Sequence, residues 1–299
     1  MFKEFTSQTQ LVNLKKSINS TISFSILRED LNHNLVSGNK LRKLKYNLIE
    51  AKKRKKDGLI SFGGRYSNHI HALASAGKIY GFKTKAIIRG DEKILLNSTL
   101  EFAVSCGMEL FFVSREEYKN RGDENYLNLL SKKYPNYFII PEGGTNTLAL
   151  KGCKEILNDI TKEYNYICCA CGTGGTLAGL ALSASNSQQL IGFNVLKKHQ
   201  NLLTSIKKMV STSNYTINNN YHFGGYAKVN EELIKFINNF YELYSVKLDA
   251  IYTGKAMYGI LDLIKKNFFP AYSKVLFVHT GGLQGNKGIE ELKGVKLPS

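Results

Sequence analysis

From residue 58 onward, short apolar runs rich in β-branched and aromatic residues alternate with longer stretches whose apolar residues recur at helical spacing. The short runs predict strands and the longer stretches predict helices. Regular alternation of the two predicts an α/β fold with open, mostly parallel sheets flanked by helices. The predicted strands are 58–62, 83–88, 109–113, 137–140, 166–170, 190–195 and 275–279. The predicted helices are 68–80, 97–106, 149–163, 175–184 and 255–266.

Glycines follow four of these strands, at 63–64, 143–144, 172–175 and 281–282. Ligands of open parallel sheets bind outside the carboxyl ends of the strands. We therefore expect these four exits, which come from distant parts of the chain, to line one pocket.

The chain has 299 residues, more than a single domain usually contains, which favours two lobes that share a cleft. We place a small α/β lobe at 46–140, inserted into a larger lobe built from 1–45 and 141–299. Ligands often bind between such lobes.

Composition favours a globular protein, because 43% of the residues are hydrophobic and 22% are charged. Residues 1–8 lack the basic and apolar regions of a signal peptide, and no apolar run has the length needed to span a bilayer. We therefore expect a soluble, cytoplasmic protein. The five cysteines are an odd number, and Cys168, Cys169 and Cys171 share one predicted buried strand. This pattern favours reduced, packed thiols over disulfides or a metal site.

A formal charge of +17 raises the possibility of nucleic-acid binding. The densest basic run, 52–56, ends a helix-like segment, where cations complement the helix dipole. The other lysines are scattered, and no nucleic-acid-binding motif accompanies them. A solvated basic surface is the favoured interpretation, with no nucleic-acid partner and no membrane partner.

Lys40 stands among small residues in Ser37-Gly38-Asn39-Lys40. An amine in such a place can reach a carbonyl and form a Schiff base. Burial beside a second cation, Lys43, would lower the pKa of Lys40 and leave its amine neutral. Without that context Lys40 would be one surface lysine among many.

The run Cys171-Gly172-Thr173-Gly174-Gly175-Thr176 follows a predicted strand and opens a predicted helix. It is neither a nucleotide-triphosphate loop nor a dinucleotide fingerprint, because the lysine of the former and the third glycine of the latter are missing. A single phosphate held by backbone amides and by the Thr173 and Thr176 hydroxyls fits it better. The alternative is a turn rich in glycine for tight packing.

Ser67 and Asn68 open another predicted helix after Gly63 and Gly64. Their polar groups and the helix N-terminus would suit a carboxylate, although either residue would also serve as an N-cap. Two further runs, 252–257 and 279–282, lie at segment ends and by themselves indicate only turns.

Taken together, these runs resemble the pyridoxal-phosphate enzymes of the 1-aminocyclopropane-1-carboxylate deaminase and D-cysteine desulfhydrase family, which has the tryptophan-synthase-β-like fold. The resemblance extends over nearly the whole chain and includes 141–146. It implies pyridoxal 5'-phosphate as the cofactor, a small amino acid as the substrate and a homodimer.

The resemblance also implies roles for individual residues. Lys40 would carry the cofactor and later remove the α-proton of the substrate. Asn68 would bind the cofactor's ring hydroxyl and Ser67 the substrate carboxylate, while Tyr252 and Tyr226 would face the substrate. The cofactor phosphate would lie against Lys43, Gly172, Thr173, Gly174, Gly175 and Thr176.

Thr253 and Thr280 would lie at the pyridine nitrogen, where deaminases resembling this chain carry Glu and Leu. A carboxylate there strengthens the electron sink, as opening a cyclopropane ring requires, whereas neutral threonines suffice for loss of a good leaving group. We therefore expect a lyase that converts D-cysteine to pyruvate, hydrogen sulfide and ammonia. A deaminase or a racemase on the same scaffold, or a binding protein that kept the fold, is the alternative.

Overall fold

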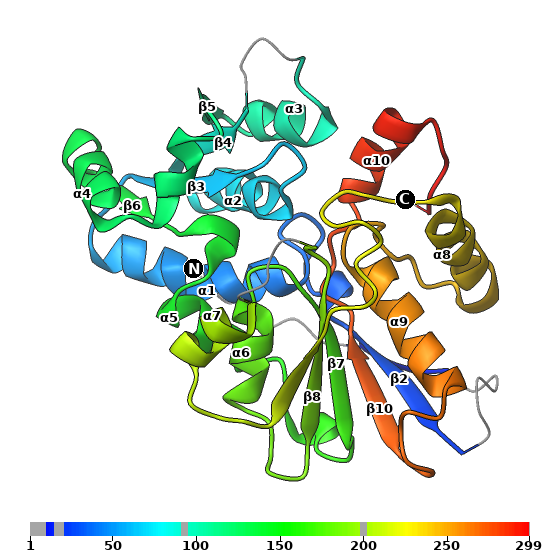
Figure 1. The fold of residues 1–299 in the computed structure, drawn as a ribbon. Coiled ribbons are helices and arrows are strands. Elements are labelled where there is room, and N and C mark those ends of the chain that lie inside the picture. The colour runs from blue at the N-terminus through cyan, green and yellow to red at the C-terminus, as the bar shows by residue number, and fades with distance from the viewer. Residues whose placement is uncertain (1–9, 15–20, 91–94, 198–201, 299) are drawn as a thin grey trace.

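The computed structural model describes residues 10–14, 21–90, 95–197 and 202–298. Residues 1–8, which bear on the expected absence of a signal peptide, lie outside this part. The strands form two separate sheets, one in each of two lobes (Figure 1).

The smaller sheet has four parallel strands in the order β5-β4-β3-β6. Its central strand β3 is buried along its whole length, as a run of apolar residues between two layers of helices requires. The bounds are β3 (Gly58–Gly63), β4 (Lys83–Arg89), β5 (Met108–Val113) and β6 (Tyr137–Ile139).

The larger sheet has six strands in the order β1-β2-β10-β7-β8-β9. Only β1 runs antiparallel to its neighbour, and the other pairs are parallel. The N-terminal strand β2 pairs with β10 from the other end of the chain, so the larger lobe is built from both ends. The bounds are β1 (Gln10–Asn13), β2 (Ser23–Arg28), β7 (Tyr166–Cys171), β8 (Gln189–Asn194), β9 (Tyr215–Asn218) and β10 (Lys274–Val278).

Helices cover both faces of each sheet and bury separate apolar layers. On the larger sheet, one face carries α5 (Thr147–Cys153), α6 (Gly175–Ala181) and α7 (Leu202–Met209), and the other carries α8 (Glu231–Tyr244) and α9 (Thr253–Lys265). On the smaller sheet, one face carries α1 (Asn39–Lys53), α2 (Asn68–Tyr80) and α3 (Ser98–Ser105), and the other carries α4 (Glu124–Lys133). Short 3-10 turns occupy η2 (Glu29–Leu31), η3 (Glu117–Gly122), η4 (Glu142–Gly144) and η5 (Asp159–Thr161).

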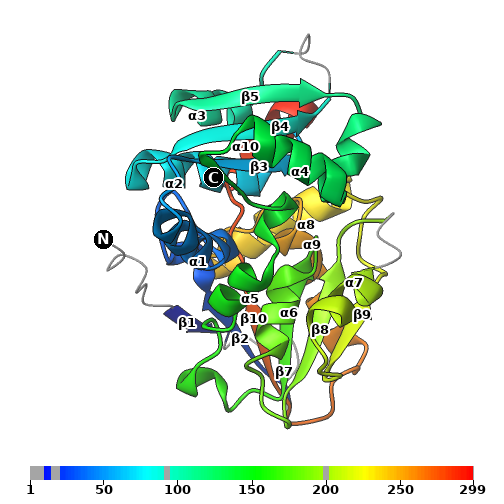
Figure 2. The same cartoon turned by 90° about the vertical axis from the view of Figure 1, so that its left-hand side faces the viewer.

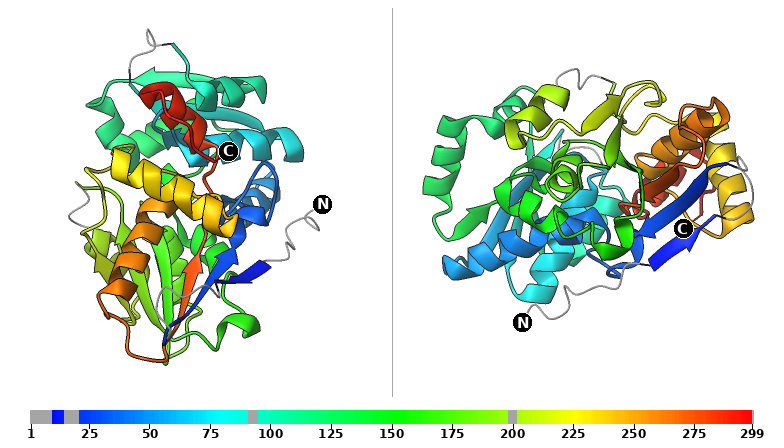
Figure 3. Two further views of the ribbon diagram at one scale, coloured as in Figure 1. Left: turned by 90° about the vertical axis from the view of Figure 1, so that its right-hand side faces the viewer. Right: turned by 90° about the horizontal axis from the view of Figure 1, so that it is seen from below.

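Two helices connect the lobes. Helix α1 lies between the two sheets (Figure 2), with its apolar face in the smaller lobe's core and its other side against α5. The predicted boundary between residues 45 and 46 therefore falls inside a helix. The last helix, α10 (Gly285–Lys293), follows β10 of the larger sheet but packs against α3 of the smaller lobe (Figure 3, left, red).

All seven predicted strands are present, each with ends within one residue of the prediction. The predicted helix 149–163 is wrong, because α5 ends at Cys153 and a new turn begins at Asn158. There the Asn158 side chain accepts from the backbone, and Thr161 closes a capping box that starts η5. Among the described residues, none of the helices has both the length and the apolar character needed to cross a membrane.

Candidate active site

A cavity of about 250 Å³ lies between the lobes at the carboxyl ends of the parallel strands. All four glycine exits contribute to its wall, which confirms the prediction that they line one pocket. Of the predicted site residues, these line the cavity: Lys40, Lys43, Ser67, Asn68, Gly172, Thr173, Gly174, Thr176, Tyr226, Tyr252 and Thr280.

Lys40 enters this cavity from the first turn of α1, and Gly38 makes that approach possible. Gly38 has a φ of +69°, and a Cβ atom there would lie 2.0 Å from the carbonyl oxygen of Thr280. The backbone N–H of the next residue, Asn39, donates to the same oxygen at 3.2 Å. The motif that carries the lysine therefore touches the glycine turn after β10 directly, although the two are far apart in sequence.

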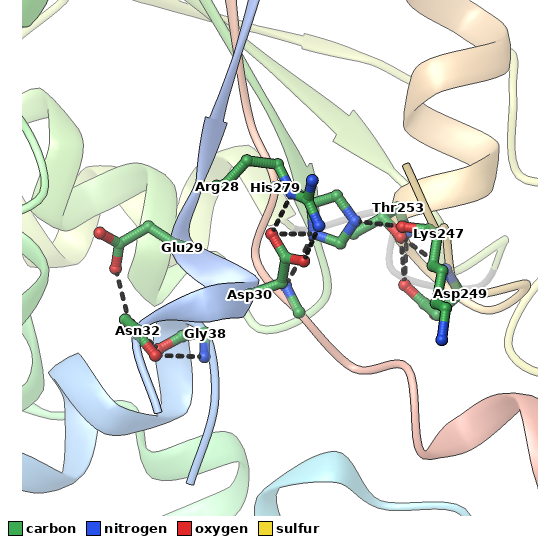
Figure 4. Close-up of polar contacts among 10 residues, drawn as sticks. Arg28, Glu29, Asp30, Asn32, Gly38, Lys247, Asp249, Thr253 and His279 are labelled. Atoms are coloured by element: carbon green, nitrogen blue, oxygen red, sulfur yellow. Dashed lines mark hydrogen bonds and ion pairs between the residues drawn. The ribbon is translucent and has the colours of Figure 1, made fainter. Parts of the chain in front are cut away.

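A buried polar network fixes the loop before Lys40 (Figure 4). The Asn32 side chain accepts from the Gly38 amide at 2.9 Å and donates to the Gly38 carbonyl at 3.1 Å. It also donates to Glu29 at 3.0 Å, and Glu29 forms a buried ion pair with Arg42 of α1 at 2.8 Å. Since every partner is satisfied, this network holds the beginning of α1 in one position.

A second arm of the network fixes the turn after β10 (Figure 4). His279 donates from Nε2 to the Lys247 carbonyl at 2.6 Å and accepts at Nδ1 from the Gly281 amide at 3.2 Å. Asp30, itself paired with Arg28, lies 3.4 Å from the same ring. These contacts on either side fix the position of the backbone at Thr280.

Asn39 joins the lysine to the glycine loop. Lys40 Nζ donates to Asn39 Oδ1 at 3.2 Å, and Asn39 Nδ2 donates to Thr176 Oγ1 at 2.8 Å. Burial, and secondly the nearby Lys43 ammonium, lower the pKa of Lys40 from 10.5 to about 7. A substantial fraction of this amine is therefore neutral and nucleophilic near neutral pH.

The glycine loop and Lys43 form a cradle for an anion. Lys43 Nζ donates to Gly143 O at 3.2 Å and to Thr145 Oγ1 at 3.0 Å, and Thr145 in turn shares a hydrogen bond of 2.7 Å with Thr173. A Cβ atom at Gly175 would lie 2.7 Å from Thr145 and 3.2 Å from Lys43 Nζ. Only glycine leaves this space open, although Gly175 itself lies behind the cavity wall.

The opposite wall comes from the beginning of α2. Ser67 is its N-cap and accepts from the Ile70 amide at 3.2 Å, so it lines the cavity and also caps the helix. Asn68 accepts at Oδ1 from Gln284 Nε2 at 2.7 Å, a contact across the two lobes. The free amides and positive dipole end of α2 make this wall suited to a carboxylate.

Two tyrosines stand together on the larger lobe's side of the cavity. The rings of Tyr226 and Tyr252 meet edge to face with centroids 6.3 Å apart. Burial raises the pKa of both phenols and outweighs the opposing charge of Arg89 at Tyr226. Both therefore keep their protons at neutral pH and can donate hydrogen bonds.

The two threonines that were predicted to meet the pyridine nitrogen differ in their surroundings. Thr280 lines the cavity, but Thr253 is fully buried and absent from the lining. Its hydroxyl donates to Asp249 at 2.6 Å, and Asp249 also accepts from the amides of Ile251, Tyr252 and Thr253. Thr253 therefore supports the beginning of α9, and its contact with the pyridine nitrogen stays a prediction.

Several lining residues were not predicted as site residues. Glu142 lies inside the glycine motif after β6 and pairs with Arg121 at 2.6 Å and with the Tyr118 hydroxyl at 2.7 Å. Its place beside a glycine exit was a usable signal. Arg89 and Gln284 line the cavity too, without a motif that would have identified them.

Within the described residues, no group of three or more potential metal ligands exists. The cavity presents the Lys40 amine, several hydroxyls and the anion cradle. A family model described as pyridoxal-phosphate-dependent enzyme matches residues 3–281. The chain belongs to this family. The residues fit the cofactor, because a lysine with a lowered pKa and a glycine-lined cradle with a buried ammonium face one cavity.

Named relatives narrow the family to that of 1-aminocyclopropane-1-carboxylate deaminases and D-cysteine desulfhydrases. A Thermotoga maritima protein provisionally named 1-aminocyclopropane-1-carboxylate deaminase is 32% identical, over 92% of this chain and 94% of its own length. An Arabidopsis thaliana mitochondrial protein, named bifunctional D-cysteine desulfhydrase/1-aminocyclopropane-1-carboxylate deaminase, is also 32% identical, over 87% of this chain and 72% of its own.

Solved structures of related proteins have the same fold. The crystal structure of a 1-aminocyclopropane-1-carboxylate deaminase homologue has a TM-score of 0.81 and 26% identity, and the match covers 97% of this chain and 94% of that one. A hydrogen sulfide-producing enzyme from Fusobacterium nucleatum shares the fold, with a TM-score of 0.66 at 16% identity over 94% of this chain and 97% of its own. The fold is thus the tryptophan-synthase-β-like fold of type II pyridoxal-phosphate enzymes.

Proposed function

We propose that this enzyme catalyses α,β-elimination on a small amino acid and that D-cysteine is its substrate. The observation that carries this proposal is the charge of the cavity wall after β10. Its side chain there is the neutral Thr280. The only carboxylate in the described lining is that of Glu142, which follows β6 instead and is paired with Arg121. Such a wall leaves a modest electron sink, which suffices when the leaving group is good.

When bound, pyridoxal phosphate supplies the sink for the electrons left by the departing α-proton. This chain's own groups do the remaining work. The Lys40 amine, with a pKa near 7, removes the α-proton as a base and then, as an acid, gives a proton to the departing hydrosulfide. Asn39 holds that amine in place, while burial, and secondly the Lys43 charge, favour its neutral form.

Helix α2 of the small lobe and the two tyrosines orient the substrate. Ser67 and the N-terminus of α2 hold the carboxylate, while the protonated phenols of Tyr226 and Tyr252 donate to the thiol side. Loss of hydrosulfide and addition of one water then yield pyruvate, hydrogen sulfide and ammonia. The two lobes exclude other water from the reacting bonds.

Asp249 gives a second argument against ring opening. A glutamate at position 253, as in the deaminases that this chain resembles, would be placed beside the buried Asp249, which already accepts four hydrogen bonds. Two neighbouring carboxylates in one buried site cannot both ionise readily. The site therefore accommodates Thr253 and disfavours the acidic residue.

The second candidate is 1-aminocyclopropane-1-carboxylate deaminase activity, alone or beside the first. Its support is the name of the Thermotoga maritima relative and the bifunctional name of the Arabidopsis thaliana one. A racemase on the same scaffold is a weaker alternative, supported only by a fold match at 15% identity to an aspartate racemase.

A substrate panel tests the proposal. The holoenzyme is incubated with D-cysteine, L-cysteine, D-serine and 1-aminocyclopropane-1-carboxylate, and sulfide, ammonia and the keto acid are measured. We expect sulfide and pyruvate from D-cysteine, and no turnover with Lys40→Ala. Turnover of the cyclopropane compound alone would replace the first candidate with the second.

We also propose, from the family resemblance, that the enzyme is a homodimer, which sedimentation equilibrium would test.

A further inference from the structure

Lys255 is the one large cationic side chain among the fully buried residues of the described structure, and the mechanism above does not use it. It lies in the first turn of α9, three residues after Tyr252. Burying an ammonium is costly unless hydrogen-bond acceptors replace its water. Its partners therefore indicate what it does.

Both partners are backbone carbonyls of one loop. Lys255 Nζ donates to Gly225 O at 2.7 Å and to His222 O at 3.0 Å. Bonds from a charged donor are about twice as strong as neutral ones. The ammonium thus ties α9 to the two ends of the tight turn 222–225.

That loop is held in an unfavourable backbone conformation. Phe223, Gly224, Gly225 and Ala227 all have positive φ, and two of the four carry a side chain. Residues with a side chain, here Phe223 and Ala227, cost of order 1 kcal/mol or more each in this region and persist only when the surroundings fix them. Inside the described loop, His222 accepts from the amides of Gly224 and Gly225, and Gly225 accepts from that of Lys228. Phe223 also packs edge to face on Tyr258 of α9, so the ammonium adds a polar tie to an apolar one.

Tyr226, next to Gly225, is the loop's contribution to the cavity, and its ring meets that of Tyr252. Tyr252 directly precedes α9, the helix that carries Lys255. The two tyrosines therefore come from segments that this one ammonium joins.

We propose that Lys255 is a positioning residue, whose ammonium clamps the loop 222–227 onto α9 and so keeps Tyr226 beside Tyr252 in the substrate cavity. The proposal rests on the proposed function in one respect only, namely that the two tyrosines contact the substrate. Asp249 stabilises the charged form of Lys255, while burial lowers its pKa to about 8, so the charge is present at neutral pH.

The test compares Lys255→Met, which keeps the length of the side chain and removes its charge, with Lys265→Met, an exposed lysine on the same helix. Each holoenzyme is examined by hydrogen–deuterium exchange over 219–228, by the absorbance of its bound cofactor, and by kcat and KM. We expect Lys255→Met to keep its cofactor and its backbone amides to exchange faster in this loop only. Its kcat/KM should fall about 100-fold, because displacing a catalytic group by 1 Å costs about that much. Lys265→Met should match the wild type.

A double-mutant cycle separates this role from general support of the fold. In a Tyr226→Phe background that has lost the phenol, Lys255→Met should lower kcat/KM far less than it does alone. Additive losses, or unchanged exchange in 219–228, would overturn the proposal. Should Lys255→Met not fold, Lys255→Gln, which retains one amide donor, enters the same measurements. The exchange data need no substrate, so they decide the proposal even if D-cysteine is not turned over.

Discussion

Lys40 shows how far one side chain's chemistry depends on what surrounds it. An ordinary lysine at pH 7 is almost entirely protonated, whereas burial and Lys43 bring the pKa of Lys40 to about 7. Asn39 then directs the amine toward the cavity and toward Thr176. Residue type and spacing indicated the amine, but its neutrality arises only from the fold.

The rate at which the apoenzyme reacts with pyridoxal should therefore rise with pH and reach half its maximum near pH 7. Only the neutral amine attacks an aldehyde, and it is present above its pKa. Pyridoxal carries no phosphate, so in this experiment Lys43 acts through its charge alone. In Lys43→Met, which removes the second cause of the lowered pKa, the midpoint should move upward but stay below 10.5. A wild-type midpoint near 10.5 would contradict the structure.

Thr253 and Thr280 should respond differently to loss of the hydroxyl. Thr253→Val removes a 2.6 Å bond to a buried carboxylate, which should cost about 1.5–3 kcal/mol of unfolding free energy. Thr253→Ser keeps the bond and serves as the control. Thr280→Val, at the cavity wall, should change cofactor affinity or turnover more than stability. Chemical denaturation and absorbance titration measure the two effects, and a reversed pattern would mean that Thr253 acts chiefly at the cofactor.

At the scale of elements, strands were predictable where each is short, apolar and buried, as in β3 and β7. The edge strands β1 and β9, of four residues each, carry too little apolar pattern to be recognised alone. Contacts such as Gly38 to Thr280 join distant segments, so no local pattern predicts them. Hence the motifs that line the cavity were predictable, while the bond from Thr253 to Asp249 was not.

The junction between α1 and the turn after β10 gives a matched pair of glycine substitutions. Gly38 and Gly81 have similar positive φ values, +69° and +75°. A Cβ atom at Gly38 would meet the Thr280 carbonyl at 2.0 Å, whereas at Gly81 it would meet no atom within 4 Å. Gly81→Ala should therefore cost only about 1–2 kcal/mol, the price of the left-handed conformation.

Gly38→Ala should cost clearly more than Gly81→Ala and should also weaken cofactor binding, because the first turn of α1 must move away from β10. Urea denaturation gives the two costs, and titration of the apoenzyme with pyridoxal phosphate gives the affinities. Equal costs, with unchanged affinity, would mean that this contact does not set the position of Lys40.

For the whole molecule, the cavity needs both lobes to hold their relative position. Helix α1 packs in the small lobe's core and against α5, α10 crosses to α3, and Asn68 reaches Gln284. A ligand that touches Lys40 and Ser67 at once therefore binds at the boundary between the lobes, which α1 and α10 both cross. The small lobe, with its last strand ending at Ile139, depends on α1 to cover one face of its sheet.

We accordingly expect the lobes to unfold together. The chain lacks tryptophan, so a single one can report on each lobe: Tyr126→Trp in α4 and Tyr166→Trp beside Phe269. With urea, the fluorescence transitions of the two variants should coincide with each other and with the loss of helical circular dichroism. If the Tyr126→Trp transition came first, the small lobe would be an independent unit. The buried Glu29 to Arg42 pair that anchors α1 would then stabilise only the larger lobe, and the cavity would open without global unfolding.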